Sequence, residues 1–347
     1  MTGDAARKDL LERVRSPKGL TVEEAAELAG ALCENRYTID EAGALLSAMA
    51  ERGETAEELL GFARTLRKLA IPFDVPGARD GVDLCGTGGA PFPTFNVSTV
   101  AAFVVSTCGQ PVVKHGNSSH RGPCGSSDLL EALGLPVKTS LEFPQATFEK
   151  ESLAFLHAPL FHRATRNVAP VRQRLGTRTI FNLLGPLTNP AHPRHQLVGA
   201  FSTGYAQLAV EVLPRLSCER VLAVHGDEGC DELSPGGPSS VFRWDDHGLS
   251  IERVEPEDLL SPGEREGDWT PLPPTEAARE TEMILQGSRE NARAGAVVLA
   301  AGAALWVTGR AEDLEGGVTL AREGIRSGRA LSKLESLRAL AREGGKG

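Results

Sequence analysis

The first seventy residues have the spacing of apolar and polar positions that amphipathic helices require. Three helical patterns each begin with a threonine that is followed three residues later by a glutamate, at Thr21, Thr38 and Thr55. In that arrangement the two side chains satisfy free backbone N–H groups at a helix start, so helices are predicted to begin there. A weaker helical pattern covers residues 5–14. The pattern predicts a small helical domain of residues 1–72 with no visible catalytic residue.

From about residue 80 onward, short apolar runs alternate with helical patterns. Strands are predicted at residues 82–85, 112–114, 153–156, 196–201 and 220–224, and helices at residues 128–133, 145–154 and 205–216. This alternation is typical of α/β proteins, in which helices cover both faces of a parallel sheet. The fold class is therefore predicted to be α/β: the helical domain plus a larger domain, residues 73–347, around a central, mostly parallel sheet.

Three smaller features complete this prediction. Asp128 and Glu131 are placed as a capping pair for the helix that ends near Gly134. Residues 262–275 are rich in proline, glycine and charge, so an exposed loop is predicted. A helical pair, near residues 291–307 and 315–342, is predicted to close the chain.

Two successive strand-to-helix turns between residues 82 and 134 carry the first candidate chemistry. The first turn has Gly86-Thr87-Gly88-Gly89 and then Asn96, Ser98 and Thr99, and the second has Lys114-His115-Gly116-Asn117. Glycine lets the main chain approach an anion without a Cβ in the way, and the first N–H groups of a following helix point at the ligand. Ligands of such sheets lie at the carboxyl ends of strands. The two turns together predict a phosphate-binding site.

Composition and charge narrow the function classes. The chain has 347 residues, a formal net charge of −9 and six cysteines without a CxxC pair. An acidic balance argues against general nucleic-acid binding, which usually requires a basic surface. Scattered cysteines are typical of reduced thiols in a cytosolic protein. The start of the chain lacks the apolar run of a signal peptide, and no segment reaches the length of a membrane span, so a cytoplasmic protein without membrane contact is predicted.

Several motifs in fixed order then carry a resemblance over nearly the whole chain. They read DLCGTGG, TFNVST, KHGN, GSSDLLEALG, APVRQRLGTRTIFNLLGPLTNP and VHGDEGCDE. In order and spacing they resemble the signature segments of the anthranilate phosphoribosyltransferase family. The resemblance implies transfer of the phosphoribosyl group from phosphoribosyl pyrophosphate (PRPP) to the amine of anthranilate in tryptophan biosynthesis, with release of pyrophosphate.

The resemblance also implies site residues. The donor PRPP would be bound by Gly86, Thr87, Gly88, Gly89, Thr94, Asn96, Ser98, Thr99, Lys114 and Ser126. The acceptor would be bound by Gly86, His115, Asn117 and Arg172, and Mg²⁺ by Ser98, Asp231 and Glu232. A guanidinium suits the acceptor carboxylate because it can make two parallel hydrogen bonds, and adjacent carboxylates suit Mg²⁺, which prefers oxygen ligands. No general base is assigned, because the amine is already a neutral nucleophile.

The family resemblance further implies a homodimer whose contact is made by the helical domain, with part of residues 170–190 packing on that domain. The chain departs from the family pattern at five positions, with Ala90 in place of an aspartate, Ser118 in place of an arginine, and His157, Arg163 and Thr165 in place of apolar residues. Either these changes are drift around an anthranilate site, or a paralogous enzyme accepts a more polar aromatic acid. Burying a new polar side chain without a partner costs about 1–3 kcal/mol, which gives the second alternative weight.

Two other classes stay open from the residues. Pyrimidine nucleoside phosphorylases are similar in fold and have a related glycine-rich site with a lysine, but the set Asn117, Arg172 and Asp231-Glu232 argues against them. A non-catalytic relative that binds nucleic acid is opposed by the acidic balance and by the retained motifs.

Overall fold

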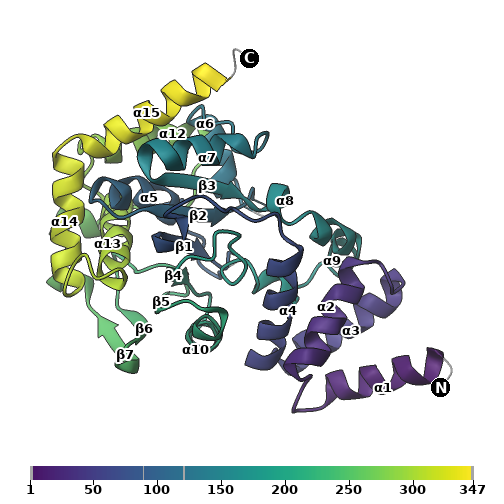
Figure 1. Cartoon of the computed structure of the whole chain (residues 1–347). Coiled ribbons are helices and arrows are strands. Elements are labelled where there is room, and N and C mark those ends of the chain that lie inside the picture. Colours follow the sequence, from purple (N-terminus) through teal and green to yellow (C-terminus); the bar gives the residue numbers. More distant parts are fainter. Residues whose placement is uncertain (1–2, 89, 120–121, 345–347) are drawn as a thin grey trace.

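The N-terminal part of the protein is a bundle of four helices. The computed structural model describes residues 3–88, 90–119 and 122–344. The helices are α1 (Gly3–Arg15), α2 (Val22–Cys33), α3 (Ile39–Arg52) and α4 (Ala56–Leu69), which lie together at one side of the molecule (Figure 1). The predicted capping boxes at Thr21, Thr38 and Thr55 are all formed. These three helix starts are therefore set by local side-chain hydrogen bonds, as the sequence predicts.

The rest of the chain is built around one seven-stranded sheet. Its strands are β1 (Val82–Gly86), β2 (Val112–Gly116), β3 (Leu153–His157), β4 (His195–Gly199), β5 (Arg220–Gly226), β6 (Ser239–Asp245) and β7 (Gly248–Val254). The strand order is β3-β2-β1-β4-β5-β6-β7. The first five strands in that order are parallel; β6 runs antiparallel to β5, and β7 runs antiparallel to β6. The predicted fold class, a small helical domain and a larger domain with a mostly parallel sheet, is confirmed.

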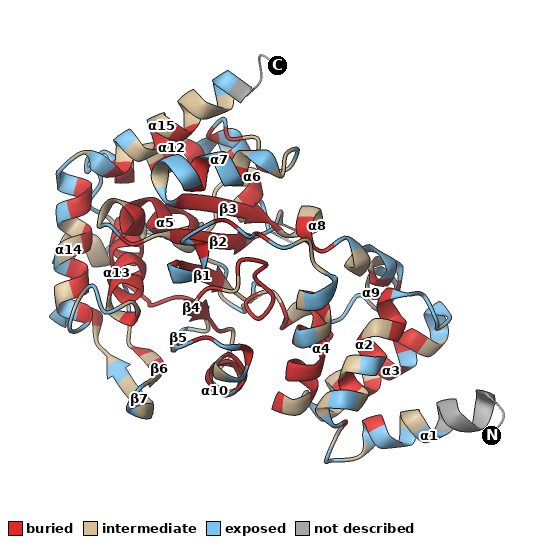
Figure 2. Cartoon of the chain, in the orientation of Figure 1, coloured by how far each residue is buried: buried red, intermediate tan, exposed pale blue. Residues whose placement is uncertain are grey.

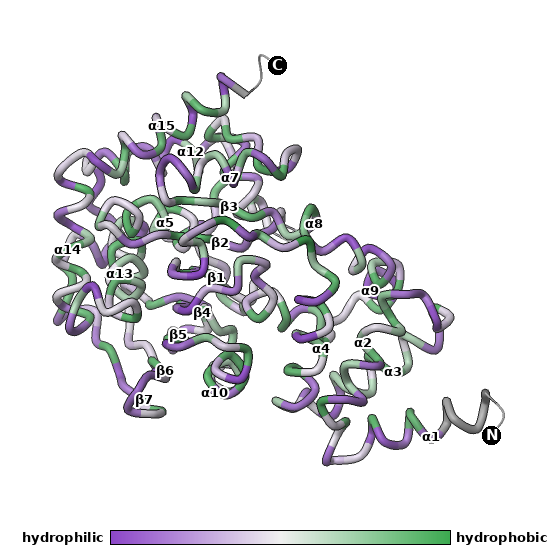
Figure 3. Tube along the Cα trace, viewed as in Figure 1, coloured by the Kyte–Doolittle hydropathy of each residue, from purple (hydrophilic) through white to green (hydrophobic). Residues whose placement is uncertain are grey.

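Helices cover both faces of the sheet. They are α5 (Val97–Thr107), α6 (Ser126–Ala132), α7 (Glu142–Glu151), α8 (Ala158–Phe161), α9 (Ala169–Leu175), α10 (Thr203–Val212), α11 (Pro262–Arg265), α12 (Pro274–Leu285), α13 (Ala292–Val307), α14 (Leu314–Arg326) and α15 (Arg329–Gly344). One face packs on α5 and α12–α15, where α13 is buried nearly all round (Figure 2) and almost uniformly hydrophobic (Figure 3). The opposite face of β4 and β5 packs on α10, the 180–187 segment and the helical bundle.

The helical bundle and the α/β domain share a hydrophobic core. The rings of Phe62 and Phe181 meet edge to face at 5.7 Å. Nearby, the Arg67 guanidinium donates hydrogen bonds of 2.8 Å to the carbonyls of Leu187 and Leu216. The segment that follows α9 is therefore held against α4, which fixes the position of the bundle relative to the sheet.

Three local predictions are corrected, and two elements were missed. The hairpin of β6 and β7 and the helix α12 were not predicted, and the predicted helix 315–342 is two helices, α14 and α15, that separate at Gly328, where φ is +74°. Residues 262–275 are not wholly exposed, because α11 lies within them and Trp269 is 5% exposed. The side chain of Asp128 does cap α6, but it accepts from the backbone N–H groups of Ser119 and Gly125, so the predicted pairing of Asp128 with Glu131 is wrong.

Candidate functional site

The turn that contains Asp231 lies directly on the carboxyl ends of β1 and β4. A Cβ built on Gly86 would be 2.9 Å from Asp231 Oδ2, and one built on Gly199 would be 2.0 Å from the Asp231 carbonyl oxygen. The backbone N–H of Gly88 donates to Asp231 Oδ2 at 3.1 Å. Only glycine fits at the two strand ends, because any side chain there would displace the acidic turn. The glycine-rich turn and the DE pair, far apart in sequence, thus form one site.

Asp231 and Glu232 are two neighbouring carboxylates in a poorly solvated position. Glu232 is 7% exposed. Burial, and then the negative charge of Asp231, raise the pKa of Glu232 to about 8, although the Lys114 charge and a hydrogen bond from the Ser98 backbone N–H act in the opposite direction. Burial likewise raises the pKa of Asp231. Burial therefore disfavours the charge on both carboxylates, the charge of Asp231 adds to this effect on Glu232, and a bound cation would relieve both effects.

The residues present fit a magnesium ion. Within the described ranges no three or more histidine, cysteine, aspartate or glutamate side chains group as a metal cage. Mg²⁺ does not require one, because it usually keeps several waters and is held by one or two carboxylates together with substrate phosphates. Asp231 and Glu232 supply two carboxylates, and the backbone N–H of Ser98, the third predicted ligand, lies close enough to Glu232 to lower its pKa.

Lys114 lies on β2 and reaches across to β1. It is 3% exposed, and its ammonium group donates a hydrogen bond to the carbonyl of Leu84 in β1. Asp83, also in β1, is 0% exposed; burial raises its pKa to about 6, against the opposing effect of Lys114. Asp83 Oδ1 accepts from the backbone N–H of His115 at 3.0 Å. The lysine is thus held between two strands, with a buried carboxylate close to it.

Asp83 was missed by the sequence analysis. A carboxylate inside an otherwise apolar, fully buried strand was the signal that could have found it. A second missed residue is Arg178, whose guanidinium lies 3.6 Å from the ring centroid of Phe201 and lowers the pKa of Asp231. Its signal, a charge in the apolar segment TRTIFNLLGPLT, was present as well.

The predicted donor residues of the first turn surround the start of α5. Among the side chains that the structure describes, three of them have buried oxygen atoms without a hydrogen-bond partner: Thr87 Oγ1, Asn96 Oδ1 and Thr99 Oγ1. Asn96 also donates from Nδ2 to the carbonyl of Cys124 at 3.2 Å, which joins the first turn to the second. Thr94 is half-buried nearby in the chain, and Gly89 lies outside the described residues. Buried oxygens without a protein partner are free to bind a polar ligand.

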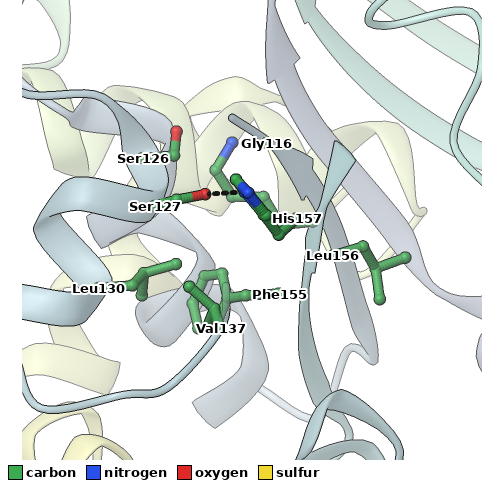
Figure 4. A pocket seen from close by; sticks show the side chains of 9 residues that line it. Gly116, Ser126, Ser127, Leu130, Val137, Phe155, Leu156 and His157 are labelled. Atoms are coloured by element: carbon green, nitrogen blue, oxygen red, sulfur yellow. Dashed lines mark hydrogen bonds between the residues drawn. The ribbon is translucent and has the colours of Figure 1, made fainter. Parts of the chain in front are cut away.

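The second turn packs against the first residues of α6. A Cβ built on Gly116 would be 3.1 Å from Ser126 Cβ, and the carbonyl of Asn117 accepts from the backbone N–H of Ser127 at 3.1 Å. One small cavity lies here (Figure 4). It is lined by apolar side chains and by Lys114, Gly116, Ser126, Ser127 and His157. Asn117 itself is exposed. The structure therefore brings Lys114 and Ser126 into one cavity.

The ring of His115 faces the protein interior. It is 2% exposed, its Nδ1 is 3.0 Å from the Gly185 carbonyl, and its centroid is 5.1 Å from that of His162. Burial, followed by the neighbouring His162, lowers the pKa of His115 to about 3, so the ring is neutral. Its buried position leaves little ring surface for an acceptor and suits an orienting role.

Arg172 is a half-buried cation on α9. Burial lowers its pKa, and within the described part of the chain its guanidinium has no hydrogen bond or ion pair. Helix α9 follows β3 and α8 in the chain and packs against α3 (Figure 1). Its neighbour Arg174 is exposed and pairs with Asp40 at 2.8 Å. Arg172 therefore differs from an ordinary surface arginine.

At the five positions that depart from the family pattern, no described side chain has a buried polar group without a partner. His157 Nδ1 is 2.8 Å from Ser127 Oγ, Arg163 is exposed, and the Thr165 hydroxyl donates to the His162 carbonyl at 2.7 Å. Ala90 is half-buried, and the Ser118 hydroxyl hydrogen-bonds to Asp128.

Comparisons with known proteins agree with this architecture. Two family models match the chain: "Glycosyl transferase family, helical bundle domain" over residues 8–70 and "Glycosyl transferase family, a/b domain" over residues 78–331. An anthranilate phosphoribosyltransferase from Geobacillus kaustophilus is 39% identical over 332 residues, which is 96% of this chain and 97% of the relative. One from Rubrobacter xylanophilus is 40% identical over 332 residues, 94% of this chain and 95% of the relative.

Solved structures give the same result. The crystal structure of anthranilate phosphoribosyltransferase from Thermus thermophilus has a TM-score of 0.87 and 38% identity, and covers 96% of this chain and 99% of its own. The enzyme from Saccharomyces cerevisiae in complex with PRPP and Mg has a TM-score of 0.87 and 25% identity, over 98% and 99% of the two chains. The resemblance seen in the sequence motifs is confirmed, and the chain belongs to the anthranilate phosphoribosyltransferase family.

Proposed function

We propose that this protein transfers the 5-phosphoribosyl group from PRPP to the amine of anthranilate and releases pyrophosphate. One observation carries the proposal: the Asp231-Glu232 turn lies on the glycine ends of β1 and β4, with Lys114 beside it. Relatives named for this activity match nearly the whole chain. A site for the diphosphate leaving group and an unpaired half-buried arginine for the acceptor carboxylate are the two features that this transfer requires.

The donor is assigned to the two glycine-rich turns. The proposed contacts are Gly86, Thr87, Gly88, Gly89, Thr94, Asn96, Ser98, Thr99, Lys114 and Ser126. The unpartnered oxygens of Thr87, Asn96 and Thr99 support this assignment. As the bond to the anomeric carbon breaks, negative charge grows on the leaving diphosphate, and the Lys114 ammonium stabilises that charge inside a site with little water.

Magnesium is assigned to Ser98, Asp231 and Glu232. When bound, the ion supplies positive charge to the diphosphate group and fixes its orientation. The two carboxylates hold that charge at the strand ends, and the Gly88 N–H, which donates to Asp231, keeps one carboxylate in place. A structure of the yeast relative contains PRPP and Mg, in agreement with this assignment.

The acceptor is assigned to Gly86, Asn117 and Arg172, with His115 as an orienting residue through its buried ring. Arg172 binds the carboxylate of the acid by charge-assisted hydrogen bonds. With donor and acceptor held in place, positioning supplies most of the rate enhancement and no general base is required.

The polar substitutions support anthranilate over a more polar acid. His157 and Thr165 have hydrogen-bond partners inside the protein, and Arg163 is directed to solvent. None of the three is an unsatisfied group that a hydroxylated acceptor would be needed to pair. A structure of the yeast relative in complex with 4-fluoroanthranilate also agrees with anthranilate as the acceptor.

We further propose a cytoplasmic homodimer whose contact is made by the helical bundle. All six cysteines are free thiols, as in a reducing compartment. Among the described residues no helix has the length and apolar character that crossing a membrane requires. Light scattering of the purified protein would test the dimer, and a monomer at micromolar concentration would contradict it.

The direct test of function is turnover. Purified protein is incubated with PRPP, Mg²⁺ and a panel of aromatic acids that includes anthranilate and hydroxylated analogues, with loss of anthranilate fluorescence and release of pyrophosphate followed in parallel. We expect magnesium-dependent turnover with anthranilate preferred. Preference for a hydroxylated acid would favour the paralogous enzyme, and no turnover with any acid would contradict the proposal.

Arg172→Ala should chiefly weaken use of the acceptor. Losing charge-assisted hydrogen bonds to a carboxylate costs about 1.5–3 kcal/mol, so the KM for anthranilate should rise about 10- to 100-fold. The dissociation constant for PRPP should stay within twofold of that of the unmodified protein, since the donor contacts lie on other elements. Steady-state kinetics and calorimetry measure the two quantities.

Arg174→Ala is the matched control for this prediction. Arg174 lies on the same helix but is exposed and paired with Asp40, and exposed ion pairs contribute little. Its KM for anthranilate should be unchanged. The role assigned to Arg172 would be contradicted if Arg172→Ala raised the KM for anthranilate no more than Arg174→Ala does. It would also be contradicted if Arg172→Ala weakened PRPP binding as much as anthranilate use.

A further inference from the structure

The cavity beside Lys114 contains a buried pair of side chains to which none of the roles above is assigned. Ser127 is 2% exposed and His157 is 8% exposed, and Ser127 Oγ lies 2.8 Å from His157 Nδ1. Figure 4 shows the two side chains facing each other at one end of the cavity, beside Gly116 and Ser126. The apolar side chains of Leu130, Val137 and Phe155 form the other end.

This hydrogen bond joins α6, which carries the donor residue Ser126, to β3, the strand beside β2, which carries Lys114. Ser127 is in the first turn of α6, and His157 is the last residue of β3, in register with Gly116 of β2. Ser126, the neighbour of Ser127, packs directly over Gly116. The first turn of α6 therefore contacts β2 through Ser126 and is tied to β3 through Ser127.

The pair is closely matched in chemistry. Burial lowers the pKa of His157, so its ring is neutral and one nitrogen accepts. Within the described residues the only hydrogen bond of the Ser127 hydroxyl is the one to His157. Removal of either side chain leaves the other with a buried polar group that has no partner, which is unfavourable. A phenylalanine at the position of His157 would leave the Ser127 hydroxyl unpaired.

We propose that His157, acting through Ser127, is a positioning residue that holds Ser126 over Gly116 and beside Lys114 for binding of the sugar diphosphate. This inference rests on the proposed function, because it assigns a role within the same donor site. His157 acts on α6 and not on the reacting atoms. It contributes chiefly to donor affinity, because Arg172, which binds the acceptor carboxylate, lies on a separate element.

The test measures binding of PRPP with Mg²⁺ by calorimetry and the KM for anthranilate by kinetics. His157→Phe and Ser127→Ala should each weaken donor binding about 3- to 10-fold, the range expected for loss of one buried hydrogen bond. The KM for anthranilate should stay within twofold. The double variant should bind PRPP about as tightly as the single variant with the lower affinity, because both changes remove the same interaction.

Two further variants separate positioning from general destabilisation. His157→Gln keeps a side-chain acceptor for the Ser127 hydroxyl and should recover donor affinity to within twofold of the unmodified protein. Thr65→Val removes a comparable hydrogen bond, from Thr65 Oγ1 to the Ala26 carbonyl in the helical bundle at 3.0 Å, and should leave donor affinity unchanged. Melting temperatures of all variants identify any that fold poorly.

The outcomes of this test are distinct. Unchanged donor affinity in His157→Phe and Ser127→Ala, or additive effects in the double variant, would overturn the positioning role. Weakening by His157→Phe that His157→Gln does not relieve would overturn it as well. Failure of the unmodified protein to bind PRPP would instead refute the proposed function, before any variant is compared.

Discussion

Lys114→Met should lower kcat/KM for PRPP by about 10²- to 10³-fold, the loss found when one preorganised electrostatic contact to developing charge is removed. Lys114 is 3% exposed and its ammonium is held by the Leu84 carbonyl, so the charge is fixed before the donor binds. Methionine keeps most of the side-chain volume and removes only the charge. Kinetics at varied PRPP measure the effect, and the KM for anthranilate should change little.

Loss of Lys114 also affects stability through Asp83, and a substitution of Asp83 separates the two effects. Lys114 lowers the pKa of the buried Asp83 carboxyl, so its loss leaves that carboxyl with less compensation and weakens the fold. The double variant Lys114→Met with Asp83→Asn removes both charges and should recover stability but not activity. Lys68→Met, on the exposed face of α4, should behave as the unmodified protein. Recovery of activity in the double variant would show that Lys114 acts only on stability.

Much of the secondary structure could be predicted because its causes are local. The capping boxes at Thr21, Thr38 and Thr55 are formed by residues three apart, so the sequence alone specifies them. The hairpin of β6 and β7 was missed although Gly248, with φ of +91°, marks its turn. Strand β7 is an edge strand whose half-buried and exposed residues alternate without a strong apolar pattern. Its position comes from pairing with β6, which is a tertiary contact.

The motifs of the candidate site could be predicted from the sequence, but the contacts between them could not. The glycine-rich turn and the DE pair are visible as motifs, but their meeting depends on β1 and β4 being neighbours in the sheet. Strand order is not encoded in any single segment. The pairing of Ser127 with His157 likewise depends on β3 lying beside β2. A substitution that looks like an isolated departure in the sequence therefore acquires its partner only in the folded chain.

Glu232→Gln should have opposite effects on activity and on stability. Glutamine has nearly the same shape but no charge to hold magnesium against the diphosphate, so kcat should fall about 10²- to 10³-fold. Magnesium titrations in the presence of PRPP should show weaker binding. Asp231→Asn should act in the same direction, while Glu228→Gln, in the same turn but outside the predicted set, is the matched control.

The stability effect follows from the pKa of Glu232, which burial and Asp231 raise to about 8 from an ordinary value of 4.5. Between these two values the folded protein holds a proton that the unfolded chain has lost, so raising the pH destabilises the fold of the metal-free protein. Glutamine does not titrate and removes this dependence. The metal-free Glu232→Gln variant should therefore melt at a higher temperature than the unmodified protein at pH 8, with the difference shrinking toward pH 5. Magnesium with PRPP should raise the melting temperature of the unmodified protein more than that of the variant, because only the former gains a counter-ion for its buried carboxylate. A variant that melts lower at pH 8, or that keeps full magnesium-dependent activity, would contradict the assignment of Glu232 as a ligand in a strained, cation-requiring site.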